Sequence, residues 1–117
     1  MPYLPGTHII ASLSTTNAPL LQTFAPLQTA LDTWITEHHL TKLGEVYHNF
    51  APAGFTAVIC LSESHISFHT WPEFGRVNLD IYLSNHKHDN EQTTQKLYNQ
   101  IVKFFEATIL TDQTIKR

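Results

Sequence analysis

Three strand-like runs and two tight turns make up the stretch FTAVICLSESHISFHTWPEFGRVNLDIYLS, residues 55–84. The runs cover residues 55–62, 65–71 and 77–84, and the turns are the Ser62-Glu63-Ser64 step and PEFGR at residues 72–76. Apolar and polar residues alternate along much of these runs, which is typical of strands with one buried face. Turns this short join antiparallel neighbours. The stretch therefore predicts the centre of an antiparallel sheet.

The flanking sequence adds further strands and two helices. Strand-like runs cover residues 7–13, 45–50 and 107–110. Apolar residues at helical spacing predict one helix that begins regularly at Pro26 and ends by Gly44, and a second helix around residues 94–105. We expect a single domain, residues 1–117, with an α+β fold: a two-layer, mostly antiparallel sheet with two helices on one face. The other face would pack in a homodimer.

The composition argues against several classes of function. The chain has 117 residues, a formal net charge of −3 and scattered basic residues, so we expect no nucleic-acid partner. Its longest strongly apolar run, residues 55–61, is too short to span a bilayer, and no leader-like segment follows Met1. We therefore expect no membrane partner and a cytoplasmic location. The single cysteine, Cys60, allows no internal disulfide, and its place in an apolar run predicts a buried side chain.

Polar side chains gather on one face of the predicted sheet. In the run from residue 77 they are Asn78, Asp80, Tyr82 and Ser84, and in the run before it they are His65, Ser67 and His69. If PEFGR closes a hairpin, His69 falls roughly opposite residues 78–80. Such a face is either a functional site or a solvated surface, and the alternation alone favours neither.

The chain has eight histidines, and their spacing does not predict a metal site. His65 and His69 are about 13 Å apart on a strand, too far for one ion. The other close histidine pairs lie at a helix end and in a polar loop. A hydrolase triad of Ser64, His69 and Asp80 would lack the GxSxG turn that exposes such a serine. Self-processing at an activated serine is the third interpretation.

The segment SESHISFHTWPE, residues 62–73, resembles the small prokaryotic S-adenosylmethionine decarboxylases, and the similarity extends over residues 47–80 and, more weakly, to GTHIIA at residues 6–11. The resemblance implies a proenzyme that cuts itself between Glu63 and Ser64 into fragments 1–63 and 64–117. It also implies a covalent pyruvoyl group generated from Ser64, which would bind the substrate amine as a Schiff base, and no metal. The substrate would be S-adenosylmethionine, in polyamine (spermidine) biosynthesis.

The resemblance also assigns roles to individual residues. His69 would be the processing base and Thr56 the processing hydroxyl. Phe50 and Glu63 would contact the substrate, and the two sheets of a homodimer would stack. Because Ser64 and His69 lie on opposite faces of a regular strand, a bend near Ser64 is expected.

Ser84 occupies the position of the family's proton-donating cysteine, and a serine hydroxyl is a much weaker acid than a thiol. Arg76 and Asn78 also replace aromatic or small residues. Three interpretations therefore stay open: an S-adenosylmethionine decarboxylase with another acid, such as water held by Ser84; a pyruvoyl-dependent arginine or ornithine decarboxylase; or a non-catalytic homologue that binds a ligand or regulates a partner. Cys60 is an alternative proton donor from a neighbouring strand.

Overall fold

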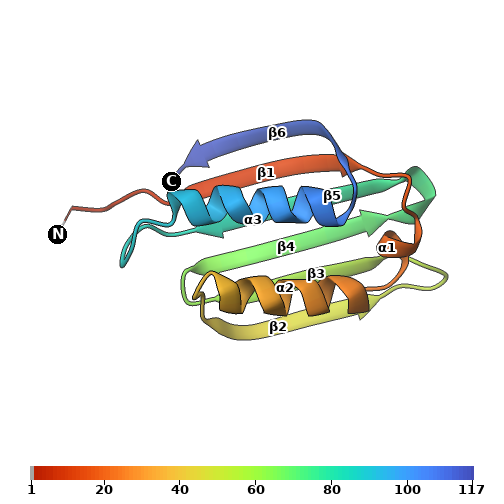
Figure 1. Cartoon of the computed structure of the whole chain (residues 1–117), viewed down its shortest axis with the longest axis horizontal. Coiled ribbons are helices and arrows are strands. Elements are labelled where there is room, and N and C mark those ends of the chain that lie inside the picture. Colours follow the sequence, from red (N-terminus) through yellow and green to blue (C-terminus); the bar gives the residue numbers. More distant parts are fainter. Residues whose placement is uncertain (1) are drawn as a thin grey trace.

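The computed structural model describes residues 2–117 and contains one six-stranded sheet, in which every neighbouring pair of strands is antiparallel (Figure 1). The strand order is β2-β3-β4-β5-β1-β6. The strands are β1 Thr7–Ser14, β2 Lys42–Asn49, β3 Phe55–Leu61, β4 Ser64–Trp71, β5 Arg76–Leu83 and β6 Thr108–Lys116. The helices are α1 Pro19–Gln22, α2 Ala25–Glu37 and α3 Glu91–Phe104, and a 3-10 turn η1 covers Pro72–Phe74. The predicted α+β fold is confirmed.

Two boundaries differ from the sequence-based prediction. Helix α2 ends at Glu37, well before Gly44, because His39 adopts the left-handed conformation (φ 59°) that commonly ends a helix. Gly44 instead lies within β2, opposite Cys60. Strand β6 continues to Lys116 rather than stopping at residue 110, because it pairs with β1 along its length. Its residues are all exposed, and its apolar members Ile109, Leu110 and Ile115 do not alternate regularly with polar ones, so the pattern did not predict this length.

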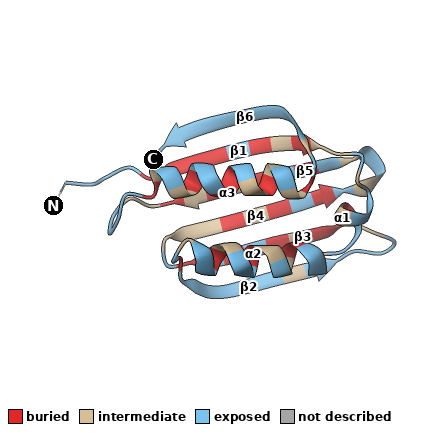
Figure 2. Ribbon diagram, in the orientation of Figure 1, coloured by how far each residue is buried: buried red, intermediate tan, exposed pale blue. Residues whose placement is uncertain are grey.

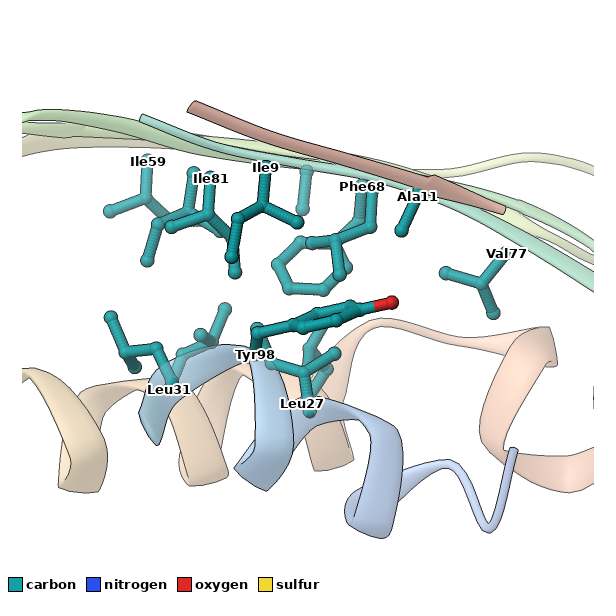
Figure 3. Packing of buried hydrophobic residues seen from close by; sticks show 14 of the residues in the cluster. Ile9, Ala11, Leu27, Leu31, Ile59, Phe68, Val77, Ile81 and Tyr98 are labelled. Carbon is teal, nitrogen blue, oxygen red and sulfur yellow. The ribbon is translucent and has the colours of Figure 1, made fainter. Parts of the chain in front are cut away.

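Helices α2 and α3 cover one face of the sheet, and the hydrophobic core lies between these helices and the sheet (Figures 1 and 2). Leu27 and Leu31 of α2 point from below toward Ile59 and Phe68 of the sheet (Figure 3). Burying each such side chain stabilises the fold by about 1.5–3 kcal/mol before entropy is counted. Buried Tyr98 of α3 also donates a 2.8 Å hydrogen bond to Asp112 of β6, which ties this helix to the edge strand.

The opposite side of the sheet, called the open face below, is not covered by either helix. Residues of β3 alternate cleanly: Ala57 and Ile59 are fully buried, whereas Val58 and Cys60 are exposed. The prediction that Cys60 is buried was therefore wrong. A continuous apolar run suggested a strand buried on both faces, but antiparallel β3 is buried on one face only. Among residues 2–117, no helix is long and apolar enough to cross a membrane.

Candidate functional site

The strand registers arrange the polar side chains of the open face in rows across the sheet. One row contains Cys60, His65 and Tyr82, which are direct partners on β3, β4 and β5. Another row, four residues further along β4, contains Thr56, His69 and Asn78. His69 thus lies opposite Asn78, as the predicted hairpin required.

The row around His69 lies next to a pocket. Thr56 Oγ1 and His69 Nδ1 are 3.1 Å apart, within hydrogen-bonding distance. Both residues line a pocket of about 290 Å³, together with Phe50, Trp71 and Glu73. Three residues predicted for the site, Phe50, Thr56 and His69, are therefore brought together. Glu73 is an additional lining residue that sequence reasoning missed, although it belongs to the quoted SESHISFHTWPE motif.

Local backbone structure places Phe50 at the mouth of this pocket. The turn after β2 is closed by a 2.8 Å hydrogen bond from the Phe50 N–H to the Gly54 carbonyl. Gly54 has a φ of 102°, which L side chains rarely adopt, and an added Cβ would lie 3.2 Å from Pro72 Cδ. Glycine is therefore needed where this turn packs against the hairpin of β4 and β5.

The Glu63–Ser64 peptide lies in the tight turn between β3 and β4, at the other end of β4. Ser64 has a φ of 151°, a region that is nearly confined to glycine. Holding a serine there costs on the order of 1–3 kcal/mol. Ser64 nevertheless keeps its register with Leu61 and Leu83, so the bend that was expected to bring it toward His69 is not seen. Backbone strain of this kind is concentrated at functional sites in proteins.

Two backbone N–H groups fix the Glu63 residue. The Ser84 N–H donates a 2.8 Å hydrogen bond to the Glu63 carbonyl oxygen, and the Thr41 N–H donates a 3.2 Å bond to its carboxylate. A donor aimed at a carbonyl stabilises negative charge that develops on its oxygen during attack on the carbon. Sequence reasoning considered only the side chain of Ser84 and missed the role of its backbone. The hairpin register, which pairs Ser64 with Leu83, would have brought this N–H close.

A small cavity of about 70 Å³ adjoins this turn. It is lined by Glu63, Ser84, His86, Lys87, His88 and Asn90. Buried Asn90 holds the loop in place, because its Nδ2 donates a 2.8 Å bond to the Ser84 carbonyl and its N–H donates a 2.7 Å bond to Asn85 Oδ1.

The structure does not bring Ser64 and His69 together within one chain. They are five residues apart on β4, which at about 3.3 Å per residue corresponds to about 16 Å. The predicted site residues therefore form two groups. Glu63, Ser64 and Ser84 lie at one end of the sheet, and Phe50, Thr56 and His69 lie at the other.

Near the Ser64 end of the sheet lies a cluster of polar side chains around His8 of β1, in the row of Tyr82 and His65. The Arg117 guanidinium is 3.3 Å from His8 Nδ1, and His8 Nε2 is 3.5 Å from Asp80 Oδ1 without a well-formed hydrogen bond. The His65 ring lies 6.1 Å from that of His8. Burial and the neighbouring His8 lower the pKa of His65, an effect that Asp80 partly opposes and Arg117 reinforces.

The described residues 2–117 contain no group of three or more His, Cys, Asp or Glu side chains arranged to hold a metal ion. His65 and His69 lie in separate rows of the open face, as the strand spacing predicted.

Comparison with known proteins gives a consistent result. A family described as S-adenosylmethionine decarboxylase matches residues 7–117. The S-adenosylmethionine decarboxylase proenzyme of Picrophilus torridus is 35% identical over 112 residues, which cover 96% of this chain and 83% of that protein. The proenzyme of Archaeoglobus fulgidus is 42% identical over 77 residues, which cover 66% of this chain and 69% of that protein.

A solved structure agrees with these matches. The crystal structure of the adenosylmethionine decarboxylase from Aquifex aeolicus superposes with a TM-score of 0.86 at 28% identity, covering 99% of this chain and 92% of that one. The sequence and structural matches extend over nearly the whole chain, including both groups of site residues. This chain belongs to the S-adenosylmethionine decarboxylase family.

Proposed function

We propose that this chain is a self-processing decarboxylase of S-adenosylmethionine, which cuts itself between Glu63 and Ser64 into fragments 1–63 and 64–117. The observation that carries the proposal is the Glu63–Ser64 peptide itself, with its strained serine and its hydrogen-bonded carbonyl, in a member of this family. The names of the relatives support the substrate. A cytoplasmic location stays a prediction.

The first step of self-cleavage uses groups that adjoin the turn. Ser64 Oγ attacks the Glu63 carbonyl carbon, the C–N bond breaks and the nitrogen takes a proton, so an ester replaces the amide. Negative charge that forms on the Glu63 oxygen faces the Ser84 N–H, 2.8 Å away. The strain at Ser64 favours this step, because breaking the peptide bond releases the constraint on φ.

The second step needs a base. Removal of the Ser64 α-proton lets the Cβ–Oγ bond break, which releases fragment 1–63 with a free Glu63 carboxylate. The remaining dehydroalanine takes up water and loses ammonia, which leaves a pyruvoyl group at the start of fragment 64–117. His69 suits the role of base, because imidazole accepts protons near neutral pH and Thr56 Oγ1 holds its Nδ1.

A second copy of the chain would bring this base to Ser64. The open face carries exposed apolar side chains among its polar ones, including Val46, Val58 and Trp71, so stacking two such faces would bury them. A two-fold axis near Ser67, midway between the two groups, exchanges the ends of β4. Each His69 would then lie opposite the partner's Ser64. We therefore propose a homodimer with two composite sites.

The two fragments would stay together after the cut. Fragment 1–63 supplies β1, β2 and β3, while fragment 64–117 supplies β4, β5 and β6, and the strand order interleaves them. Strand β4 pairs with β3 on one side and β5 on the other, so the new end at residue 64 remains fixed in the sheet.

These residues fit a covalent pyruvoyl group at position 64, because the backbone there is already irregular and the adjoining Glu63 carbonyl is held by the Ser84 N–H. Such a group supplies a carbonyl that binds the substrate amine and withdraws electrons from the bond to the carboxylate. The protein would bind and orient the rest of the substrate. The pocket near His69 offers the aromatic rings of Phe50 and Trp71, which suit a purine ring or a sulfonium, and the carboxylate of Glu73.

Intact mass spectrometry of the purified protein tests this proposal. We expect two fragments, 1–63 and 64–117, the second beginning with a pyruvoyl group, and carbon dioxide release from S-adenosylmethionine. Persistence of the full-length chain at neutral pH would contradict the self-processing claim. Release from arginine or ornithine alone would establish the alternative substrates.

A further inference from the structure

This inference rests on the proposed function. Turnover requires an acid that donates a proton to the substrate, and the site residues described above include no clear candidate for it. Decarboxylation breaks the bond between the α-carbon and the carboxylate and leaves the electron pair on the carbon. An acid must then give up a proton to form the new C–H bond. Ser84 is the polar side chain that adjoins the reacting end of β4, but an aliphatic hydroxyl is too weak an acid to serve efficiently.

The 70 Å³ cavity beside Ser84 provides the missing route. Water occupies about 30 Å³ in the liquid and needs two to four polar partners when it is bound in a protein. The cavity is large enough for water and is lined by the polar side chains of Ser84, His86 and His88. It adjoins the reacting end, because it is also lined by Glu63, the residue before Ser64.

We propose that water held against Ser84 in this cavity, hydrogen-bonded to the imidazoles of His86 and His88, delivers the proton to the substrate's α-carbon. The imidazolium gives its proton to the water chain, the water gives one to the carbon, and solvent restores the imidazolium. Histidine suits this role because its charge changes near neutral pH. Lys87 also lines the cavity, but ammonium groups are in general much weaker acids than imidazolium groups.

The loop is held in a defined position for this role. Buried Asn90 fixes the Ser84 carbonyl from one side, and the Ser84 N–H is bound to Glu63 on the other. The side chains of His65 and Cys60 are two alternative proton donors. His65 follows Ser64 directly, but its lowered pKa leaves less of it protonated near neutral pH. Cys60 is exposed on the open face, in the row of His65.

Replacing both histidines by Gln keeps hydrogen bonding in the cavity but removes the exchangeable charge. We expect the His86→Gln, His88→Gln double variant to cut itself normally and to turn over about tenfold or more slowly. More of its fragment 64–117 should end as inactive protein with an N-terminal alanine, because the proton reaches the wrong carbon more often. His38→Gln, an imidazole on the helix side, is the matched control and should behave like the wild type.

A second arm identifies the route. In a Ser84→Cys background the thiol donates directly, so the same double variant should lose little further activity. Equal turnover of the double variant and the wild type overturns the inference alone. If Cys60→Ala or His65→Gln loses turnover and the double variant does not, the proton donor is Cys60 or His65, and the inference is wrong. Absence of product from the wild type as well overturns the proposed function together with this inference.

A third arm does not depend on turnover. In uncut Ser64→Ala protein, nuclear Overhauser contacts between long-lived water and the amide protons of Ser84 and His86 should be seen. Adding Ser84→Val, which fills part of the cavity with methyl groups, should remove them. If the contacts are absent from the Ser64→Ala protein, or unchanged by valine, the cavity does not hold the proposed water.

Discussion

The two ends of β4 differ in a way that explains how such a small chain can process itself. At one end Ser64 has an irregular backbone, and the Glu63 carbonyl that it would attack is bonded to the Ser84 N–H. At the other end His69 lies on a regular strand with Thr56 beside it and an open pocket, but without a scissile bond. The nucleophile and the base are thus about 16 Å apart. If Ser64 and His69 have the proposed roles, the difference teaches that one chain contains both halves of the site and that a second copy is needed to bring them together.

The largest expected effect comes from removing the nucleophile. Ser64→Ala should abolish the cut completely, because residue 64 then has no hydroxyl that can attack the Glu63 carbonyl. Ser62→Ala, two residues away in the same turn, is the matched control and should be cut normally. Denaturing gel electrophoresis after long incubation measures both. A Ser64→Ala chain that still yields fragments would show that the cut lies elsewhere.

Removing the base should have a nearly equal effect, but with a chemical signature. His69→Ala should stop the second step and leave part of the chain as an ester, which hydroxylamine cleaves. The His48→Ala variant, in the same row of the open face, serves as a control for loss of a nearby imidazole. Normal cutting by the His69→Ala protein would refute the role of this residue.

Weakening the support of the base should have an intermediate effect. Thr56→Val keeps the shape of the side chain but removes the hydroxyl 3.1 Å from His69 Nδ1. General-base catalysis commonly contributes about 10²–10⁴-fold, and loss of the group that orients the base should remove part of this. We expect slow self-cleavage in Thr56→Val and near-normal cleavage in Thr56→Ser, followed by timed mass spectrometry. If Thr56→Val and Thr56→Ser cut themselves at the same rate, the Thr56 hydroxyl has no role in self-cleavage.

A gain of activity is expected at Ser84. Ser84→Cys should raise the turnover of S-adenosylmethionine by about tenfold, which corresponds to about 1.4 kcal/mol of barrier, and should lengthen the active lifetime. Cutting should be unchanged, because the backbone N–H that contacts Glu63 is kept. If the wild type already works at the rate of the cysteine variant, its own proton donor is fully adequate.

The smallest effect concerns stability and pH. Because folding lowers the pKa of His65 below its ordinary 6.5, the unfolded chain binds more protons than the folded chain just below that pH. The stability that neutral His65 contributes is therefore present above pH 6.5 and is lost as the pH falls. His65→Gln should flatten the decline of the melting temperature between about pH 7 and 5. An unchanged slope would show that His8 or another group causes the decline.

Alternation of side chains predicted most of the sheet, since β3, β4 and β5 begin and end within about two residues of the expected positions. The pattern was ambiguous in β6, where apolar and polar residues do not alternate regularly, and in β3, where an exposed cysteine lies in an apolar run. The residues of both site groups were predicted, but their separation was not, because spacing along the strand was converted into a distance for His65 and His69 but not for Ser64 and His69. The contact between the Ser84 N–H and Glu63 is made by the backbone, so the residue types alone could not predict it.

The central claim is that the site is composite, and mixing two inactive variants tests it most directly. Ser64→Ala chains keep His69, and His69→Ala chains keep Ser64, so neither variant alone should be cut. After the two are unfolded together and refolded, mixed dimers place an intact His69 opposite an intact Ser64. Mass spectrometry should then show fragments from the His69→Ala chain only, in up to about half of those chains if pairing is random. If the mixture stays uncut although mixed dimers form, Ser64 and His69 do not act across two copies, and the account is wrong.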